Sequence, residues 1–509
     1  MNTIFRRWLD KCKSRINRRL EKGRRVNPLH PSFAASNIHY EVSNKTHAIS
    51  YGGIGLCLVL AKRYGLVKDI DERLHLLKFH LPYHESDHVL NIAFNALCGG
   101  ECLQDIELLR NDENYLNAIG ATSIPDPTTA GDFCRRFIAS DIETLIDIIN
   151  QVRLRVWAEQ PRSFLDCATI DMDGTFAETN GECKKGMDIS YDGTWGYHPL
   201  ILSLANTGEV LSIVNRSGNR PSHENAYREI ERSLSLCFQA GFEKILLRGD
   251  TDFSQTQYLD GWNANAKIRF IFGYDSKRNL EEIADNLPES AWRRLTRPAK
   301  YEVKTEPRQR PENVKDRIVK EREYETLRLQ SEDIAEFEYR PGACGESYRM
   351  VVVRKNITRQ KGEKQLFDDN RYFFYITNER EWSREEIVFS ANDRCNQENL
   401  IAQLKSGVGA LRAPVDTLES NWAYMLMTAL AWNLKAWWAL SLSVSSGRWE
   451  QRHREQKDRV LRMEFKTFLR AFVLLPCQIL RTGRKLIYRL LGWNPNLEIF
   501  FRLVGQMRC

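Results

Sequence analysis

The sequence lacks the features that mark secreted, zinc-binding and membrane-spanning proteins. No apolar stretch of signal-peptide length follows the N-terminal charges, so we expect a cytoplasmic protein. The 12 cysteines include no repeated C-x-x-C, and Cys98 and Cys102 have no matching His or Cys pair close by, which favours reduced thiols over a zinc site. Residues 423–442 are apolar and long enough for a membrane span. They carry Asn433 and Lys435 near the middle, however, where a lysine costs about 2.5–3.5 kcal/mol on insertion. We therefore predict a buried helix there and no membrane partner.

Length and charge indicate a large protein with a polyanionic partner. The 509 residues, 42% of them hydrophobic, suffice for about three domains, or for one domain with insertions. The net charge is +7, and ten of the first 25 residues are Lys or Arg. A second basic stretch runs from Arg448 to Arg489. Such clusters favour nucleic acid as a partner, although a basic surface without a partner has the same composition.

The pattern of apolar residues divides the chain into four kinds of region. Residues 1–150 have helical periodicity, and strand patterns begin at Phe164 with "FLDCATIDMDGTF", "GYHPLILSLA" and "EVLSIVN", which predict three antiparallel strands. Ser222 is the expected cap of a helix that ends near Gly241, and the strands "KILLRGD" and "KIRFIFGYD" follow it. A charged stretch and three strand-like runs between residues 300 and 385 indicate a β-rich insertion, and a helix comes after it.

Three acidic residues stand where this order of elements can bring them together. Asp173 ends the first strand, Asp250 ends the strand "KILLRGD", and Glu398 lies on the helix after the insertion. Such a cluster repels itself unless cations neutralise it, and two Mg²⁺ ions held there would serve displacement at phosphorus. Each acid also has a simpler explanation, since Asp173 precedes a turn glycine and Asp250 could cap the next segment.

The stretch "DRCNQENLIAQLK" places Arg394, Glu398 and Lys405 at spacings of four and seven. On a regular helix these side chains lie within a stripe about 40° wide. A solvated helix face has the same appearance, and it gains only about 0.2–0.5 kcal/mol from such a pair.

Together these motifs resemble the DDE transposases of bacterial insertion sequences. The resemblance rests on "IDMDGT", "GYHPLILSLANTGEVL", "LRGDTDF" and the spacing Arg-x3-Glu-x6-Lys, and it extends to "ISYGGIGL", "LCGGECLQDIELLRND" and "LMTALAWNL". It implies an α/β or α+β fold with an RNase H-like catalytic core and a β-rich insertion, flanked by helical regions. The implied divisions are a helical DNA-binding region with a basic arm (1–150), the core (151–299 and 386–445), the insertion (300–385) and a basic helical C-terminal region (446–509).

The resemblance also implies the site and its partners. Asp173, Asp250 and Glu398 match the metal-binding catalytic acids of the family, which use Mg²⁺ or Mn²⁺, and two ions are expected. Arg394 and Lys405 match the DNA-binding cations that accompany the glutamate. The implied partners are double-stranded DNA, as terminal inverted repeats and target, and a second copy of the chain in the DNA complex, in the cytoplasm of a bacterium at its nucleoid.

Two departures and two other functions remain open at this point. The family signature begins with a tyrosine three residues before the arginine, where this chain has Ala391. Asp171 lies on the same strand face as Asp173 and is a second candidate for the first ligand. An active transposase is expected; the alternatives are a sequence-specific DNA-binding protein that has lost cleavage and a stand-alone metal-dependent nuclease.

Overall fold

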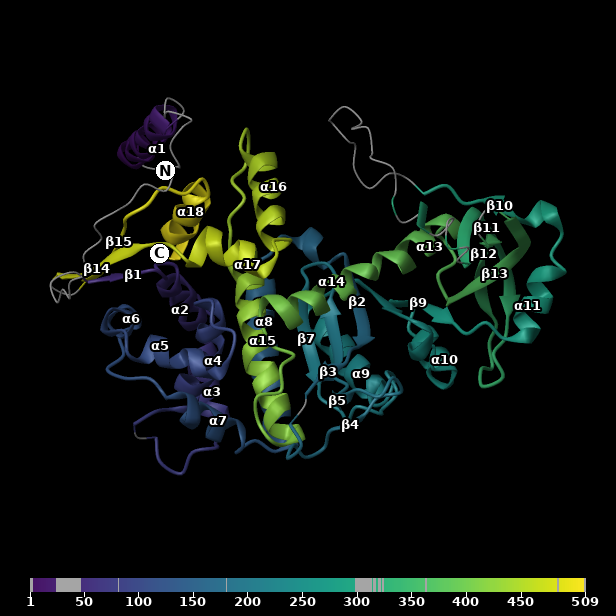
Figure 1. Cartoon of the computed structure of the whole chain (residues 1–509), viewed down its shortest axis with the longest axis horizontal. Helices are drawn as coiled ribbons and strands as arrows, with labels where there is room; N and C mark the ends of the chain where they lie inside the picture. The colour runs from purple at the N-terminus through teal and green to yellow at the C-terminus, as the bar shows by residue number, and fades with distance from the viewer. Residues whose placement is uncertain are drawn as a thin grey trace.

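The computed structural model describes residues 3–23, 47–80, 82–179, 181–297, 325–361, 364–482 and 485–507, with a few isolated positions between 314 and 322. Figure 1 shows a helical part that holds both terminal segments, a sheet in the middle, and a β-rich part at the opposite end. The described chain is thus a mixed α/β protein, as expected.

A mixed sheet of nine strands runs through the molecule. Its strands are β2 (Cys167–Gly174), β6 (Leu200–Leu204), β7 (Glu209–Val214), β8 (Lys244–Gly249), β9 (Ile268–Tyr274), β10 (Arg293–Arg294), β11 (Glu325–Tyr339), β12 (Tyr348–Lys361) and β13 (Lys364–Thr377). Their order is β10-β11-β12-β13-β9-β8-β2-β6-β7. The β2–β8 and β8–β9 pairs are parallel, and β2, β6 and β7 form the predicted antiparallel set. β6 and β7 are buried along their whole length, which explains why their apolar runs do not alternate.

The helix after β7 begins differently from the prediction. Helix α9 (Ala226–Ala240) follows Asn225, whose φ of 61° is left-handed, and no side chain caps it. Ser222 instead lies in a turn, where the Nη1 of Arg216 donates hydrogen bonds to the carbonyls of Pro221, Ser222 and Glu224. The predicted Ser222 cap is therefore wrong, because Arg216 organises this turn through three backbone carbonyls and the helix begins after it.

Helices α8 (Ala139–Ala158) and α15 (Leu418–Leu440) pack against β7 at one end of the sheet. The other helices of this part of the chain are α1 (Thr3–Gly23), α2 (Ile54–Arg63), α3 (Leu66–Arg73), α4 (Glu85–Leu97), α5 (Ile106–Arg110), α6 (Glu113–Ile119) and α7 (Pro127–Cys134). α15 packs against α4, α8 and β7 and is buried over nearly its whole length, as predicted. Its Asn433 pairs with both backbone groups of Val210, at 2.9 and 3.0 Å, so the amide serves as a link to the sheet. Across the described ranges, no helix is long and apolar enough to cross a membrane.

The predicted insertion continues the same sheet. β13 pairs with β9 from Phe374↔Tyr274 to Thr377↔Ile271, so the hydrogen-bonded ladder passes from the core strands to β11–β13 without a break. Helix α10 (Leu259–Asn263) lies between β8 and β9 in sequence, and α11 (Arg278–Asp285) lies between β9 and β10. Most of the charged stretch 304–325 lies outside the described residues.

The C-terminal region, expected to be helical, also contains a hairpin. Helices α16 (Glu450–Leu461), α17 (Phe465–Phe468) and α18 (Leu497–Met507) enclose strands β14 (Cys477–Thr482) and β15 (Lys485–Leu490). β14 also pairs with β1 (Ala48–Ile49), so the hairpin joins the two ends of the described chain. A purely helical region is thus incorrect: "CQILRT" and "KLIYRL" are paired with each other, which the basic composition did not reveal.

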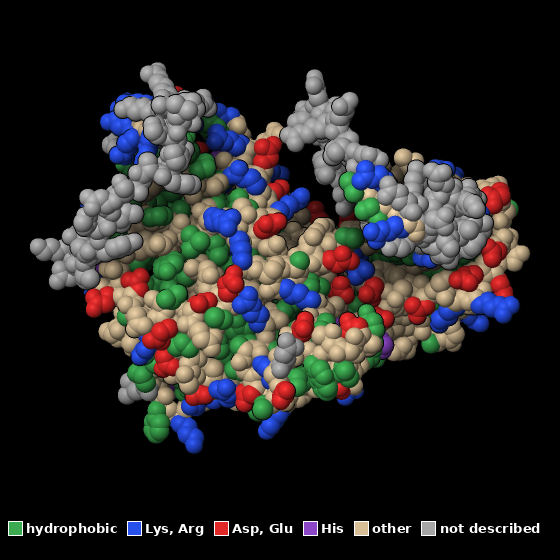
Figure 2. All heavy atoms as spheres, in the orientation of Figure 1, with side chains coloured by type: hydrophobic (Ala, Val, Ile, Leu, Met, Phe, Trp, Pro, Cys, Tyr) green, Lys and Arg blue, Asp and Glu red, His purple; other side chains and the backbone are tan. Residues whose placement is uncertain are grey.

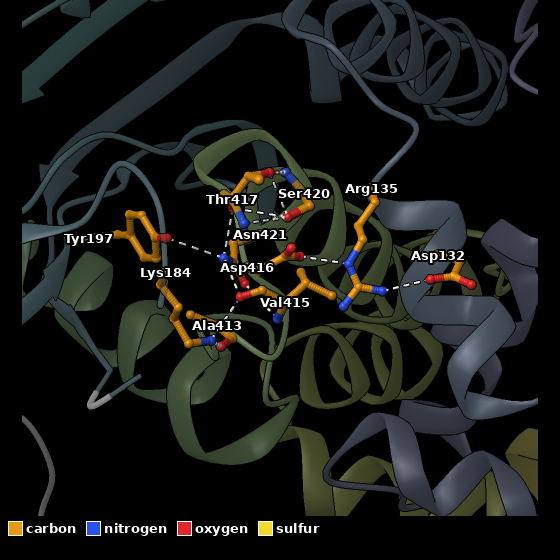
Figure 3. A network of polar contacts seen from close by, with 10 residues as sticks. All are labelled: Asp132, Arg135, Lys184, Tyr197, Ala413, Val415, Asp416, Thr417, Ser420 and Asn421. Atoms are coloured by element: carbon orange, nitrogen blue, oxygen red, sulfur yellow. Dashed lines mark hydrogen bonds and ion pairs between the residues drawn. The ribbon is translucent and has the colours of Figure 1, made fainter. Parts of the chain in front are cut away.

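The segment between β2 and β6 forms a small separate sheet. It consists of β3 (Ala177–Glu178), β5 (Trp195–Tyr197) and β4 (Asp188–Ile189), in that order. Figure 3 shows how its base is attached to the loop before α15, where Lys184 donates to the carbonyl of Val415 at 2.8 Å. The Lys185 amide, which is not drawn in the figure, donates to the Asp416 carbonyl at 2.7 Å. Arg135, just after α7, holds the Asp416 carboxylate from the other side at 2.7 Å. The residues at the base of the small sheet therefore attach it to the helical part of the protein.

Candidate active site

Two of the predicted acids stand at the ends of neighbouring parallel strands. Asp173 is the penultimate residue of β2, and Asp250 directly follows β8. Because β2 and β8 run in the same direction, with Asp171 opposite Arg248, both carboxylates reach the same edge of the sheet. Asp250 also accepts the Asp252 amide at 3.0 Å, so it caps a short turn as well.

Arg394 lies between these two carboxylates. Its Nη1 is 3.4 Å from Oδ2 of Asp173 and 4.0 Å from Oδ2 of Asp250. All three side chains are mostly buried, with exposed fractions of 22%, 15% and 32% for Arg394, Asp173 and Asp250. The arginine therefore partly neutralises two acids that would otherwise repel each other in a poorly solvated place.

Glu398 and Lys405 act on the same carboxyl group. The negative charge of Glu398 is among the causes that raise the pKa of Asp173, and the charge of Asp173 opposes the burial that lowers the pKa of Lys405. Arg394, Asp173 and Asp250 are thus joined by ion pairs, and Glu398 and Lys405 are linked to Asp173 through the effects of charge on pKa.

The segment that carries them is not one regular helix. Helix α13 (Arg384–Asp393) ends just before Arg394, α14 (Cys395–Ala402) carries Glu398, and Lys405 lies in a π-helical turn, Gln403–Gly407. The predicted stripe on a single helix is therefore incorrect in geometry. A break at Arg394 and a wider turn at Lys405 now direct the three side chains.

Buried Gln397 attaches α14 to the sheet. It donates to the Ile201 carbonyl at 3.1 Å and accepts a hydrogen bond from the Ser203 hydroxyl, both on β6. Because Gln397 directly precedes Glu398, its hydrogen bonds to β6 fix the position of Glu398 relative to the sheet. Sequence reasoning missed Gln397, since a single glutamine on a helix gives no signal.

Asp173 has a strongly perturbed pKa. Burial raises the pKa to about 7, Arg394 opposes the rise, and the charges of Asp250 and Glu398 add to it. Burial likewise raises the pKa of Asp250. The carboxyl of Asp173 therefore holds a proton to higher pH than an exposed aspartate does, because burial and the neighbouring acids disfavour its charged form.

The donor atoms suit a hard divalent cation. Carboxylate oxygens are the ligands that Mg²⁺ and Mn²⁺ prefer, and a cation would relieve the repulsion that raises the pKa of Asp173. As drawn, however, the described residues contain no group of three or more His, Cys, Asp or Glu side chains that could hold a metal ion. Arg394 occupies the position between two of the acids instead. The donor atoms therefore fit a divalent cation, but Glu398 does not form one group with Asp173 and Asp250 in this structure.

Asp171, the other candidate for the first acid, has a different partner. Its two oxygens accept from Nε and Nη2 of Arg248 at 2.7 and 2.9 Å, and only 1% of the residue is exposed. Both oxygens are thus engaged by a guanidinium, which leaves Asp173 as the acid that faces Asp250.

His198 borders the site and was not predicted. A β-carbon placed on Gly174, the residue after Asp173, would lie 3.0 Å from Nε2 of His198. The Nδ1 atom lies 2.8 Å from the Arg220 carbonyl, so Nδ1 carries the proton and Nε2 is an acceptor in the neutral ring. Burial lowers the pKa of His198, which favours that neutral form. A lone histidine in "GYHPL" carries no sequence signal for this position.

Cations outside the site are spread over the molecule. Figure 2 shows Lys and Arg side chains around α1 and down the middle of the face in view, with Asp and Glu side chains among them. The described cations of α1 are exposed: Arg6, Arg7, Lys11, Lys13, Arg15, Arg18 and Arg19.

Comparison with known proteins gives two findings. A model of the family described as Transposase DDE domain group 1 matches residues 36–495. Among solved structures, the chain is similar to a piggyBac transposase in a synaptic complex with hairpin DNA, with a TM-score of 0.35, 11% sequence identity and 84% of each chain covered. No curated protein matches this chain.

Proposed function

This chain belongs to the family Transposase DDE domain group 1, and on that premise we propose that it binds the terminal inverted repeats of an insertion sequence and cleaves and joins DNA strands in a metal-dependent reaction. The observation that carries the proposal is the position of Arg394 between Asp173 and Asp250, with Glu398 acting on the same carboxyl. We assign catalysis and metal binding to Asp173, Asp250 and Glu398.

An RNase H-like core is part of the proposal. The strand order β9-β8-β2-β6-β7, with β2, β6 and β7 antiparallel and β8 and β9 parallel to β2, supports it. In this arrangement Asp173 and Asp250 stand at the carboxyl ends of two central parallel strands, and we propose that α14, which packs against β2, supplies Glu398 as the third acid when metal binds.

Mg²⁺ or Mn²⁺, two ions in our proposal, would activate the attacking water or 3′-hydroxyl and stabilise the leaving oxygen. Two residues of the protein must change state before metal ions can bind between the acids. Asp173 must give up the proton that it partly holds at neutral pH, and Arg394 must leave the space between the acids. A DNA phosphate offers the displaced guanidinium a new anionic partner with two acceptor oxygens, while Lys405 contributes a point charge beside it.

The proposed partners are double-stranded DNA and a second copy of the chain in the DNA complex. The exposed cations of α1 fit contacts with phosphates that do not depend on base sequence. We propose that the protein acts at the DNA of a bacterial cell.

The test is cleavage of DNA that carries the inverted repeats flanking the gene. We expect wild-type protein to cut it with Mg²⁺, and Asp173→Asn, Asp250→Asn and Glu398→Gln each to bind the ends without cutting them, since each change removes a ligand charge and keeps the shape. Glu455→Gln, an exposed carboxylate on α16, is the matched control and should cut normally. Binding without cutting by the wild type would instead indicate a DNA-binding protein derived from a transposase.

A further inference from the structure

A second charged layer lies directly beneath the two acids that end β2 and β8. Asp171 precedes Asp173 by two residues, and Arg248 precedes Asp250 by two, so strand alternation places each pair on one face. Asp171 and Arg248 are direct neighbours in the parallel register and form the bidentate pair described above. The lower layer is thus neutral, whereas the upper one is anionic.

The same arginine reaches out of the sheet to helix α13. Its Nη1 donates to the Ser390 carbonyl at 2.8 Å. In a continued α-helix that carbonyl would accept the Arg394 amide, but the helix breaks there and the Arg394 amide bonds to the Asn392 carbonyl instead. Arg248 therefore satisfies a backbone group that the break leaves open.

The break is also the point from which the site is built. Arg394 stands at it, and Glu398 lies one turn further along α14. We propose that Asp171, Arg248 and the Ser390 carbonyl form a positioning bridge, which holds the break at Arg394 and thereby sets Arg394 and Glu398 over Asp173 and Asp250. The bridge acts through other residues and touches no substrate. The proposal rests on the proposed cleavage activity for its kinetic test, and has a second test that does not.

Arg248→Lys is the most informative variant, because a lysine keeps the charge but cannot make the bidentate contact and reach Ser390 at once. The pair Arg153 and Glu209 supplies the matched control: both side chains are fully buried and 3.1 Å apart, yet they lie on α8 and β7, away from α13. Arg153→Lys should perturb the fold to a similar degree. If Arg248→Lys does not fold, Asp171→Asn combined with Arg248→Gln removes both charges and leaves neither uncompensated.

The kinetic measurement is single-turnover cleavage per folded molecule at saturating DNA and Mg²⁺. We expect Arg248→Lys to lose about 100-fold in rate, the loss typical of catalytic groups misplaced by an ångström, while DNA affinity and the rate of Arg153→Lys stay near wild type. A rate for Arg248→Lys within twofold of wild type would reduce the pair to a purely structural role.

Hydrogen exchange on the protein alone supplies the readout that needs no activity. Arg248→Lys should exchange faster within residues 384–402, and Arg153→Lys should exchange faster in α8 and β7. Faster exchange spread evenly over β2 and β8, with 384–402 unchanged, would overturn the bridge. If the wild type fails to cleave, the proposed function falls, and the exchange pattern still decides the bridge.

Discussion

Binding of Mg²⁺ to the metal-free protein should release a proton from Asp173, and the number released should fall steeply between pH 6 and pH 8. The pKa of Asp173 is about 7 because it is buried near Asp250 and Glu398. A metal ligand must be deprotonated, so Asp173 should release about 0.9 proton at pH 6, about 0.5 at pH 7 and about 0.1 at pH 8, and Asp250, whose pKa burial also raises, adds to the release at low pH. Apparent affinity should rise about tenfold from pH 5.5 to pH 6.5 and level off above pH 7.

Calorimetric titration in buffers of different ionisation enthalpy counts these protons directly. Arg394→Gln removes the cation that lowers the pKa of Asp173. In this variant the release of the Asp173 proton on Mg²⁺ binding should therefore extend to higher pH. Glu455→Gln should behave as wild type. Binding at pH 6 without proton release would refute the reasoning, because Asp173 would then already be ionised.

The same pKa fixes the sign of a stability effect in the absence of metal. The folded protein holds the proton that an unfolded Asp, with a pKa of 3.8, gives up. Stability from this group is therefore full below about pH 4 and is lost as pH rises through about 7. About three pH units at about 1.4 kcal/mol each give an upper limit of about 4 kcal/mol. Without metal, Asp173→Asn should thus be more stable than wild type at pH 8 and equal to it at pH 4, by denaturant unfolding.

Three further predictions concern cations. Arg394→Gln and Lys405→Gln should slow cleavage at saturating DNA more than they weaken DNA binding. Arg394→Gln should cause the larger loss of rate, because a guanidinium binds a phosphate with two donors. Cleavage rates within about twofold of wild type for both variants would support a solvated helix face. Burial lowers the pKa of Lys435 to about 7, so its stability cost is greatest below pH 7 and vanishes near pH 10.5; Lys435→Met should raise the melting temperature at pH 6 but not at pH 10.5. Deleting residues 1–25 should reduce the slope of log affinity against log salt by about 0.9 per lost phosphate contact, and an unchanged slope would exclude the arm from DNA.

Local patterns were sufficient for the elements that form the core. Apolar runs indicated β2, β6, β7, β8 and β9, and the lysine within residues 423–442 indicated a buried helix rather than a membrane span. These features depend on burial, and the pattern of apolar residues within each segment is enough to indicate it.

Features that depend on a distant partner could not be predicted. The helix break at Arg394 depends on Arg248, which binds the Ser390 carbonyl from a strand 142 residues earlier. Even at six residues, the hydrogen bond from Arg216 to the Ser222 carbonyl gives no local signal, although it helps to shape the turn before α9. The spacing of Arg394 and Lys405 predicted a shared face of one regular helix, whereas the structure divides this segment between α13, α14 and a π-helical turn. Asp173 was preferred to Asp171 only because Asp-Gly-Thr fits the family pattern, and the contact that separates their roles in the structure, the pairing of Asp171 with Arg248, could not be predicted.

The continuous ladder from β9 to β13 has a consequence for any attempt to shorten this chain. Removing β11–β13 would turn β9 into an edge strand, with the backbone groups of residues 271–274 unpaired beside the apolar side chains of Ile271 and Phe272. Exposed edges of this kind pair with other chains and aggregate. A shortened version of this protein would therefore need a replacement for β13, a short charged or proline-bearing strand, before its solubility could be compared with that of the parent.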